Sequence, residues 1–163
     1  MSTGTWREDA RRSGWPEAAP DARPFVPQSR AHVLILDDHA PSREVCAGYC
    51  DLFDHTSESV AAAGEAVTAL RRSAFGVVVL SVHAEAWDAL EVVPAIRALP
   101  GPAGRTPIIG LTGVGRDDEA QRWLAAGLAA VLPKPVTAAR LFAALGAALD
   151  DGDTEPRSWA PVR

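Results

Sequence analysis

The stretch that most constrains the fold is VLILDD, residues 33–38, in which four consecutive aliphatic residues lead directly into Asp37 and Asp38. The apolar run is too short for a helix and does not alternate with polar residues, which is typical of a strand buried on both faces of a parallel sheet. Such sheets bind ligands just beyond the carboxyl ends of their strands. Two adjacent carboxylates at that edge repel each other unless a positive group lies between them, and a hard cation such as Mg²⁺ is the usual solution. An alternative is that Asp38 only caps the next helix, because Pro41 suits a first helical turn.

The rest of the chain alternates between strand-like and helical segments. Residues 76–81, GVVVLS, show the clearest strand pattern, whereas residues 56–62 show a weak one. Asp88 and Glu91 have the spacing of a capping box and mark a helix start, and Pro94 is expected to bend that helix. Five strands alternating with five helices predict a three-layer α/β sandwich around a parallel sheet. The expected strands are residues 33–36, 56–62, 76–81, 107–112 and 129–132, and the expected helices are residues 41–53, 64–72, 88 onward, 117–126 and 137–149.

The chain of 163 residues is expected to form one domain at residues 31–149, which is long enough to bury its own core. Residues 1–30 and 150–163 combine proline and charged residues without periodicity, so we expect two disordered tails. An alternative is that the aromatic residues of these segments dock on the domain or on a partner.

Composition excludes several classes of partner. The net charge of −5 argues against sequence-independent nucleic-acid binding, which needs a basic surface. No apolar run approaches the roughly 20 residues of a membrane span, and the N-terminus lacks the apolar core of a secretory signal. Cys46 and Cys50, the only cysteines, are expected to be small core residues, because nothing nearby completes a disulfide or a metal site. We therefore expect a cytoplasmic protein that binds neither nucleic acid nor membranes.

Polar residues stand at the ends of the other strong strands. Ser81 ends the third strand, Thr112 ends the fourth, and Lys134, the only lysine in the sequence, follows the fifth. In a parallel sheet these ends converge with Asp37 and Asp38 on one side. A hydroxyl and an ammonium group facing two carboxylates form a site for a metal-bound phosphoryl group. Each residue alone has an ordinary explanation, but their coincidence at four strand ends predicts a site.

This arrangement resembles the receiver domain of two-component response regulators, and the resemblance covers residues 32 to about 149. The segments that carry it are VLILDD, PSREV, the run from 76 to 91, RTPIIGLTG, AAG and LPKP. The stretch ALPGPAGRTPIIGLTG is most similar to receivers attached to hybrid histidine kinases. The resemblance implies a CheY-like, flavodoxin-like fold with strand order 2-1-3-4-5.

The resemblance also implies roles for the residues at the strand ends. Two carboxylates and one backbone carbonyl would bind Mg²⁺, and a hydroxyl and an ammonium group would contact the phosphoryl group. The Lys134–Pro135 peptide bond would be cis, which is chemically plausible for a bond before proline. The metal ligands would be Asp37, Asp38 and the carbonyl of His83, and the phosphoryl contacts would be Thr112 and Lys134.

One departure from the family pattern is decisive. Ser81 stands where receivers carry the aspartate that accepts phosphate, and Asp88 follows seven residues later, as the family's loop-ending aspartate does. The usual Met-Pro of the intervening loop is Ala84-Glu85 here. A neutral hydroxyl is not a nucleophile without an activating base, and the loss of one carboxylate leaves Mg²⁺ binding weak or absent. We expect Lys134 to pair directly with Asp37 or Asp38 and to hold the domain in one state.

The sequence therefore predicts a stand-alone pseudo-receiver of a phosphorelay, without enzymatic activity and with no required cofactor. Its expected partners are a histidine kinase, a phosphotransfer protein or another signalling protein. By resemblance, the contact surface is built from the fourth helix, fifth strand and fifth helix of the domain, and the same surface would serve a homodimer. We call the residues expected on this surface the partner face: Arg116, Trp123, Val131 and Arg140.

Three alternatives remain open from the sequence. An unorthodox receiver could still be modified at Ser81 or at another residue. A regulatory module could bind a nucleotide or another small molecule in the vacated pocket. A phosphatase-like enzyme with Asp37 as nucleophile is the least favoured, because the acid that such enzymes carry two residues later is His39 here.

Overall fold

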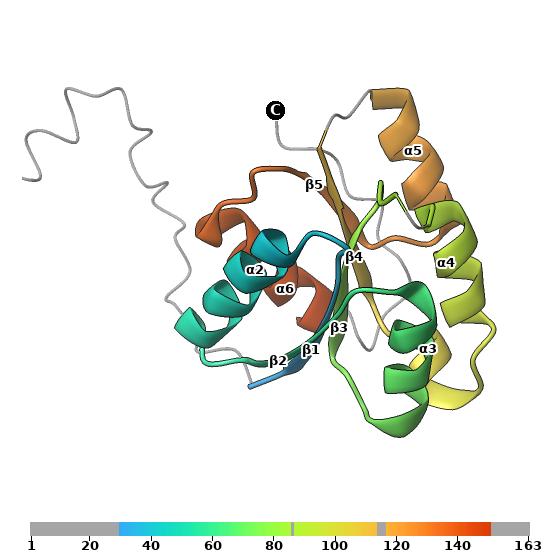
Figure 1. The fold of residues 1–163 in the computed structure, drawn as a ribbon, viewed down its shortest axis with the longest axis horizontal. Helices are drawn as coiled ribbons and strands as arrows, with labels where there is room; N and C mark the ends of the chain where they lie inside the picture. Colours follow the sequence, from blue (N-terminus) through green and yellow to red (C-terminus); the bar gives the residue numbers. More distant parts are fainter. Residues whose placement is uncertain (1–29, 86, 114–116, 151–163) are drawn as a thin grey trace, which may run out of the picture.

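The computed structural model describes residues 30–85, 87–113 and 117–150, and these residues form a five-stranded parallel sheet with helices on both faces (Figure 1). The strand order is β2-β1-β3-β4-β5. The three-layer architecture and the 2-1-3-4-5 order expected from the sequence are confirmed. The strands are β1 (His32–Leu36), β2 (Thr56–Val60), β3 (Val77–Ser81), β4 (Ile108–Thr112) and β5 (Ala130–Pro133).

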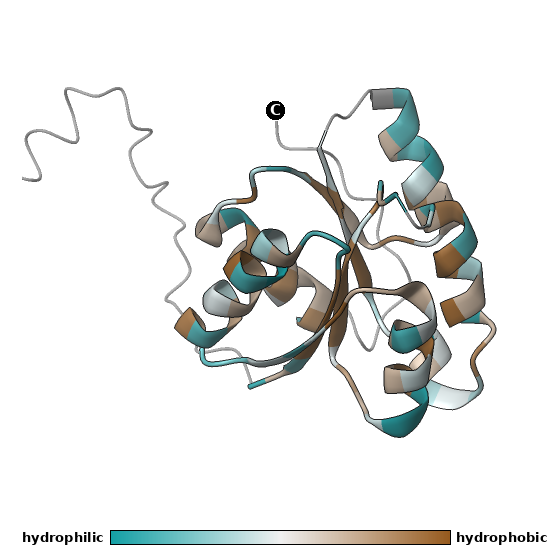
Figure 2. Cartoon of the chain, viewed as in Figure 1, coloured by the Kyte–Doolittle hydropathy of each residue, from teal (hydrophilic) through white to brown (hydrophobic). Residues whose placement is uncertain are grey.

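Two helices cover one face of the sheet and three cover the other, which produces two hydrophobic layers (Figures 1 and 2). One layer lies between the sheet and α2 and α6, and the other lies between the sheet and α3, α4 and α5. The helices are α2 (Ala40–Leu52), α3 (Ala63–Arg72), α4 (Ala89–Arg97), α5 (Asp117–Ala126) and α6 (Ala138–Asp150), with a short 3₁₀ helix η1 (Gly101–Arg105) before β4.

The central strands explain why the aliphatic runs carry no alternation. Alternate side chains of β1 and β3 enter opposite layers, so every position from Val33 to Leu36 and from Val77 to Leu80 is buried. Strand β2 lies at the edge of the sheet and is only partly buried, which accounts for its weak signal in the sequence.

The helix starts are partly as expected. Asp88 caps α4, and its Oδ1 accepts a hydrogen bond of 2.8 Å from the backbone amide of Leu90. The alternative that Asp38 only caps the first helix is wrong. The N-cap residue of α2 is His39, and the carboxylate of Asp38 accepts a hydrogen bond from the amide of Glu85 instead. Pro94 lies inside α4, where the missing amide removes one helical hydrogen bond.

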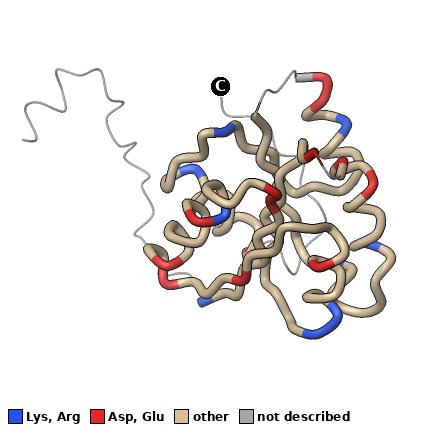
Figure 3. The backbone as a smooth tube through the Cα atoms, viewed as in Figure 1, with Lys and Arg blue, Asp and Glu red and all other residues tan. Residues whose placement is uncertain are grey.

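Cys46 and Cys50 are free thiols on the buried side of α2, as expected for core residues. Burial raises their pKa to about 11 and about 12, respectively. The expected tails fall almost wholly outside the described residues. Within those residues, no helix combines the length and the apolar character that a membrane span requires. Acidic and basic residues are interspersed around the described chain (Figure 3).

Candidate functional site

The site is built where four strands end at the same edge of the sheet. Strand β1 leads into Asp37, while β3 and β4 end at Ser81 and Thr112. Lys134 directly follows β5, and its amide donates a 2.7 Å hydrogen bond to the carbonyl of Thr112. The registers align these ends, since Leu36 lies opposite Leu80 in the parallel pairing of β1 and β3. The sheet therefore brings together the residues that the sequence predicted to meet.

Lys134 connects two of the strand ends through its ammonium group. Its Nζ lies 2.8 Å from Oδ2 of Asp37 and 3.2 Å from Oγ of Ser81. The side chain of Asp37 is only 3% exposed and that of Lys134 is 25% exposed, so the ion pair is partly shielded from water. The predicted pairing of Lys134 with one of the two aspartates is formed with Asp37. The Lys134–Pro135 bond is cis, as the resemblance implied.

Both carboxylates also accept hydrogen bonds from the backbone. Oδ1 of Asp37 accepts from the amide of His39 at 2.9 Å. Oδ2 of Asp38 accepts from the amide of Glu85 at 2.9 Å, across 47 residues of sequence. Hydrogen bonds to a charged acceptor are stronger than those between neutral groups. Each aspartate is thus engaged by groups of the chain itself.

The hydroxyl of Ser81 is buried and has a partner on each side. It donates to the carbonyl of His83 at 3.2 Å and accepts from Nζ of Lys134. The indole Nε1 of Trp87 donates to the backbone carbonyl of Ser81 at 3.2 Å. A carbonyl oxygen cannot take up a proton at neutral pH, and Lys134 is a donor in this contact. Neither of these two partners of the Ser81 hydroxyl, the contacts found among the described residues, can activate it as a nucleophile.

The donor set fits a magnesium ion poorly. Each of the three groups implied by the resemblance already has a partner within the protein: Oδ2 of Asp37 contacts Lys134, Oδ2 of Asp38 contacts the amide of Glu85, and the carbonyl of His83 contacts Ser81. Mg²⁺ requires near-octahedral oxygen ligation, usually with carboxylates. Ser81 supplies a hydroxyl and no carboxylate. In the described part of the chain, no three histidine, cysteine, aspartate or glutamate side chains gather in a group able to hold a metal ion.

The partner face is only partly as expected. Trp123 is 3% exposed, so the expectation that it lies on the surface needs correction. Its large apolar ring points inward from α5 and packs edge-on against His83, with the ring centroids 5.1 Å apart. Val131 on β5 is partly buried and Arg140 on α6 is exposed. Arg116 lies outside the described residues.

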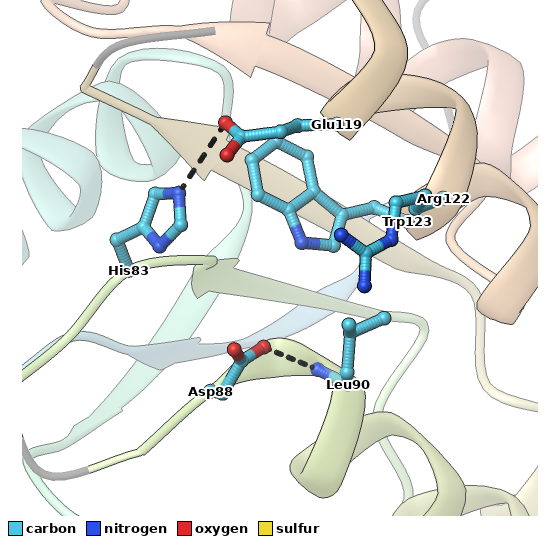
Figure 4. A pocket seen from close by; sticks show the side chains of 6 residues that line it. All are labelled: His83, Asp88, Leu90, Glu119, Arg122 and Trp123. Atoms are coloured by element: carbon cyan, nitrogen blue, oxygen red, sulfur yellow. Dashed lines mark hydrogen bonds and ion pairs between the residues drawn. The ribbon is translucent and has the colours of Figure 1, made fainter. Parts of the chain in front are cut away.

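A small cavity lies beside the site, between α5 and the chain that follows β3 (Figure 4). Its volume is about 90 Å³, well below the roughly 300 Å³ at which ligand pockets begin. Nothing in the sequence pattern pointed to the cavity, to the contact of Trp87 or to the contact of the Glu85 amide. The only hint was the unusual Ala84-Glu85 pair. The cavity is lined by His83, Asp88, Leu90, Glu119, Arg122 and Trp123.

Comparison with known proteins identifies a sequence family and related proteins. The sequence profile described as "Response regulator receiver domain" matches residues 33–146. The chain is similar to the sensor histidine kinase AruS of Pseudomonas aeruginosa, with 33% identity over 124 residues, covering 76% of this chain and 12% of AruS. It is also similar to the virulence sensor protein BvgS of Bordetella pertussis, with 34% identity over 139 residues, covering 81% of this chain and 11% of BvgS. The chain thus spans about a tenth of the length of these relatives.

Solved structures show the same fold. The chemotaxis response regulator CheY4 of Vibrio cholerae superimposes with a TM-score of 0.67 at 25% identity, over 74% of this chain and 100% of that chain.

Proposed function

Because this chain belongs to the response regulator receiver domain family, and is thus a receiver domain of a two-component signalling system, we propose that it is a pseudo-receiver. It acts by binding other signalling proteins, without aspartyl phosphorylation and without enzymatic activity of its own. The observation that carries this proposal is the state of Ser81, whose hydroxyl donates to the carbonyl of His83 and accepts from Lys134.

Two physical consequences of Ser81 support the proposal. An aspartate at this position would be an anionic nucleophile at neutral pH, whereas a hydroxyl must first lose its proton. The proton of Ser81 is directed at a carbonyl, and the carboxylate of Asp37 is paired with Lys134, the same ammonium group that contacts Ser81. Phosphoryl transfer to this chain therefore lacks both the nucleophile and the base.

The same substitution removes the need for a metal. We propose that the domain requires no cofactor and that Mg²⁺ binds it weakly, since only Asp37 and Asp38 remain as carboxylates at the strand ends. The Lys134–Asp37 pair, 2.8 Å long, supplies the positive charge that otherwise would come from a cation. The pair holds the domain in a single state that does not respond to a phosphodonor.

Receiver domains interact with histidine kinases or phosphotransfer proteins. We propose that the partner of this chain is such a protein or another signalling protein, and that contact is made through α5, β5 and α6. Val131 and Arg140 remain the candidates among the described residues, Arg116 stays a prediction, and a homodimer through the same surface is the alternative use. A pull-down with and without the Arg140→Glu substitution tests the assignment, because reversing an exposed charge weakens a complementary contact.

Phosphorylation itself is tested by incubation with acetyl phosphate and Mg²⁺, followed by intact-mass measurement and treatment with hydroxylamine. The unmodified protein is expected to gain no phosphoryl group, while a conventional receiver treated in parallel is labelled. A hydroxylamine-labile adduct on the unmodified protein would overturn the proposal. An acid-stable adduct that disappears in Ser81→Ala would instead identify an unorthodox receiver modified on the serine.

A further inference from the structure

The segment after β3 is held against the site by bonds that need neither metal nor phosphoryl group. We call it the β3–α4 connection, and its described residues are 82–85, 87 and 88. We propose that Asp38 is the anchor of this connection through the amide of Glu85, and that the connection in turn positions α5 through His83. The proposal deepens the proposed function, because it gives Asp38 a role in a domain that does not depend on a metal.

On the side of the site, three hydrogen bonds that involve a side chain hold the described residues of the connection, in addition to the backbone bond from the amide of Val82 to the carbonyl of Leu111. The amide of Glu85 donates to Oδ2 of Asp38 at 2.9 Å, and the hydroxyl of Ser81 donates to the carbonyl of His83 at 3.2 Å. The indole of Trp87 donates to the carbonyl of Ser81, and this contact is buried. The bond to Asp38 is the one of the three that has a carboxylate as its acceptor.

On the side of α5, the same connection covers a buried aromatic ring (Figure 4). The imidazole of His83 meets Trp123 edge-on with centroids 5.1 Å apart, and its Nε2 lies 3.9 Å from Oε2 of Glu119. The side chain of His83 is itself 53% exposed, whereas Trp123 is 3% exposed. The imidazole of His83 thus covers part of the Trp123 ring, and a shift of the connection would expose the indole to solvent.

The two sets of contacts are joined by a single intervening residue, Ala84. His83 touches α5 and Glu85 touches Asp38, so a displacement at one end is transmitted to the other by the short chain between them. Asp38 therefore acts as a positioning residue for α5, which belongs to the surface proposed to bind partners. Coupling of this kind must be measured rather than read from proximity.

Two matched pairs of variants test whether Asp38 acts through its hydrogen bond to the Glu85 amide or as a metal ligand. Asp38→Asn retains an oxygen that accepts the Glu85 amide but lacks the charge that a metal prefers, whereas Asp38→Ala removes the acceptor. Glu85→Pro removes the donor, whereas Glu85→Ala keeps it, because the bond uses the backbone. All four are compared with the unmodified protein in EDTA, by amide hydrogen exchange and by the ¹H–¹⁵N resonance of the Trp123 indole.

The proposal predicts that the two variants that break the Asp38–Glu85 hydrogen bond differ from the two that keep it. Asp38→Ala should raise the exchange of the Glu85 amide about tenfold and shift the Trp123 indole signal, and Glu85→Pro should shift the same signal. Asp38→Asn and Glu85→Ala should leave the Trp123 signal close to that of the unmodified protein. An unchanged Trp123 signal in both Asp38→Ala and Glu85→Pro would overturn the proposal, as would equal effects of Asp38→Asn and Asp38→Ala.

A double-mutant cycle between Asp38→Ala and His83→Ala tests the transmission to α5. If the connection couples the two sites, the effects on acrylamide quenching of Trp123 are non-additive, and additive effects would refute the coupling. Quenching is followed in a protein in which Trp6, Trp15 and Trp159 are replaced by phenylalanine and Trp87 is kept, because its indole bonds to Ser81. The same variants carrying Trp123→Phe give the quenching of Trp87 alone, which is subtracted. These measurements use neither Mg²⁺ nor a phosphodonor, so their failure is distinguishable from a failure of the pseudo-receiver proposal.

Discussion

Nζ of Lys134, the only lysine in the sequence, lies 2.8 Å from Oδ2 of Asp37, a carboxylate whose side chain is 3% exposed. The pair spans 97 residues of sequence and joins the end of β1 to the end of β5. A shielded carboxylate without a partner is costly, so the lysine neutralises a charge that the fold would otherwise leave buried. The same ammonium group reaches Ser81, which places all three residues in one network.

Removal of the lysine should destabilise the domain. Lys134→Met leaves Asp37 buried and unpaired, and we expect the free energy of unfolding at neutral pH to fall by about 2 kcal/mol. The loss should stay below that of a fully buried pair, because the lysine side chain is 25% exposed. Urea denaturation measures the change. The double variant Lys134→Met, Asp37→Asn is the control and should recover part of the loss, and a single variant as stable as the unmodified protein would contradict the role of the pair.

Ser81→Asp should create a metal site. The substitution adds a third carboxylate beside Asp37 and Asp38, and an added charge close to a cation strengthens its binding. We expect affinity for Mg²⁺ to rise at least about tenfold, measured by titration calorimetry, and tryptophan fluorescence to respond to beryllofluoride with Mg²⁺. Ser81→Asn is the matched control, since it has a similar size without the charge. If the fluorescence of Ser81→Asp does not change on addition of beryllofluoride with Mg²⁺, Ser81 is not the only residue that prevents metal and phosphoryl binding at the site.

Arg97 should be a structural clamp. Its guanidinium donates to the carbonyls of Gly104 at 3.1 Å, Thr106 at 2.7 Å and Gly127 at 3.0 Å, so it ties the end of α4 to η1 and to the turn after α5. Burial lowers the pKa of Arg97 from its ordinary value. Arg97→Met removes all three bonds and should reduce the free energy of unfolding by about 2–3 kcal/mol.

Arg97→Lys should recover only a small part of that loss, because an ammonium group lacks the planar fork that reaches several carbonyls at once. Arg71→Met, at an exposed position on α3, is the control and should change the stability by less than about 0.5 kcal/mol. Equal stabilities of Arg97→Met and Arg71→Met would contradict the clamp.

His55 should make the stability depend on pH. Its Nδ1 accepts a 3.1 Å hydrogen bond from the amide of Ala31, and its buried Nε2 has no partner within residues 30–85, 87–113 and 117–150. Burial lowers the pKa of His55 below its usual value of 6.5, with Asp54 acting in the opposite direction. Folding therefore favours the neutral ring, so its contribution is complete above about pH 6.5 and is lost as the pH falls below that value.

The measurement is thermal unfolding of the protein and of His55→Phe between pH 7.5 and pH 5. The variant should lose less stability over this interval than the unmodified protein, because it cannot take up the proton. The three other histidines are common to both proteins and cancel in the comparison. Identical pH profiles would show that protonation of His55 does not oppose folding.

Much of the fold follows from local patterns. Unbroken aliphatic runs such as residues 33–36 predict strands buried on both faces, and the alternation with helices predicts a parallel sheet. Parallel strands end at one edge, so the meeting of Asp37, Ser81 and Lys134 could be expected from their positions after three different strands. The weak prediction of β2 has a physical cause, since an edge strand buries little and carries few apolar residues.

The sequence by itself thus determined the class of fold and which side chains gather at the edge of the sheet, because burial and periodicity are local properties. Tertiary structure alone decided which partner each group takes: Asp38 holds the amide of Glu85, and Trp123 turns inward against His83. Such contacts depend on the path of a loop and on the space between two helices, where a backbone amide and a carboxylate far apart in sequence come within 3 Å. No residue pattern encodes that distance, because an amide is present at every residue except proline.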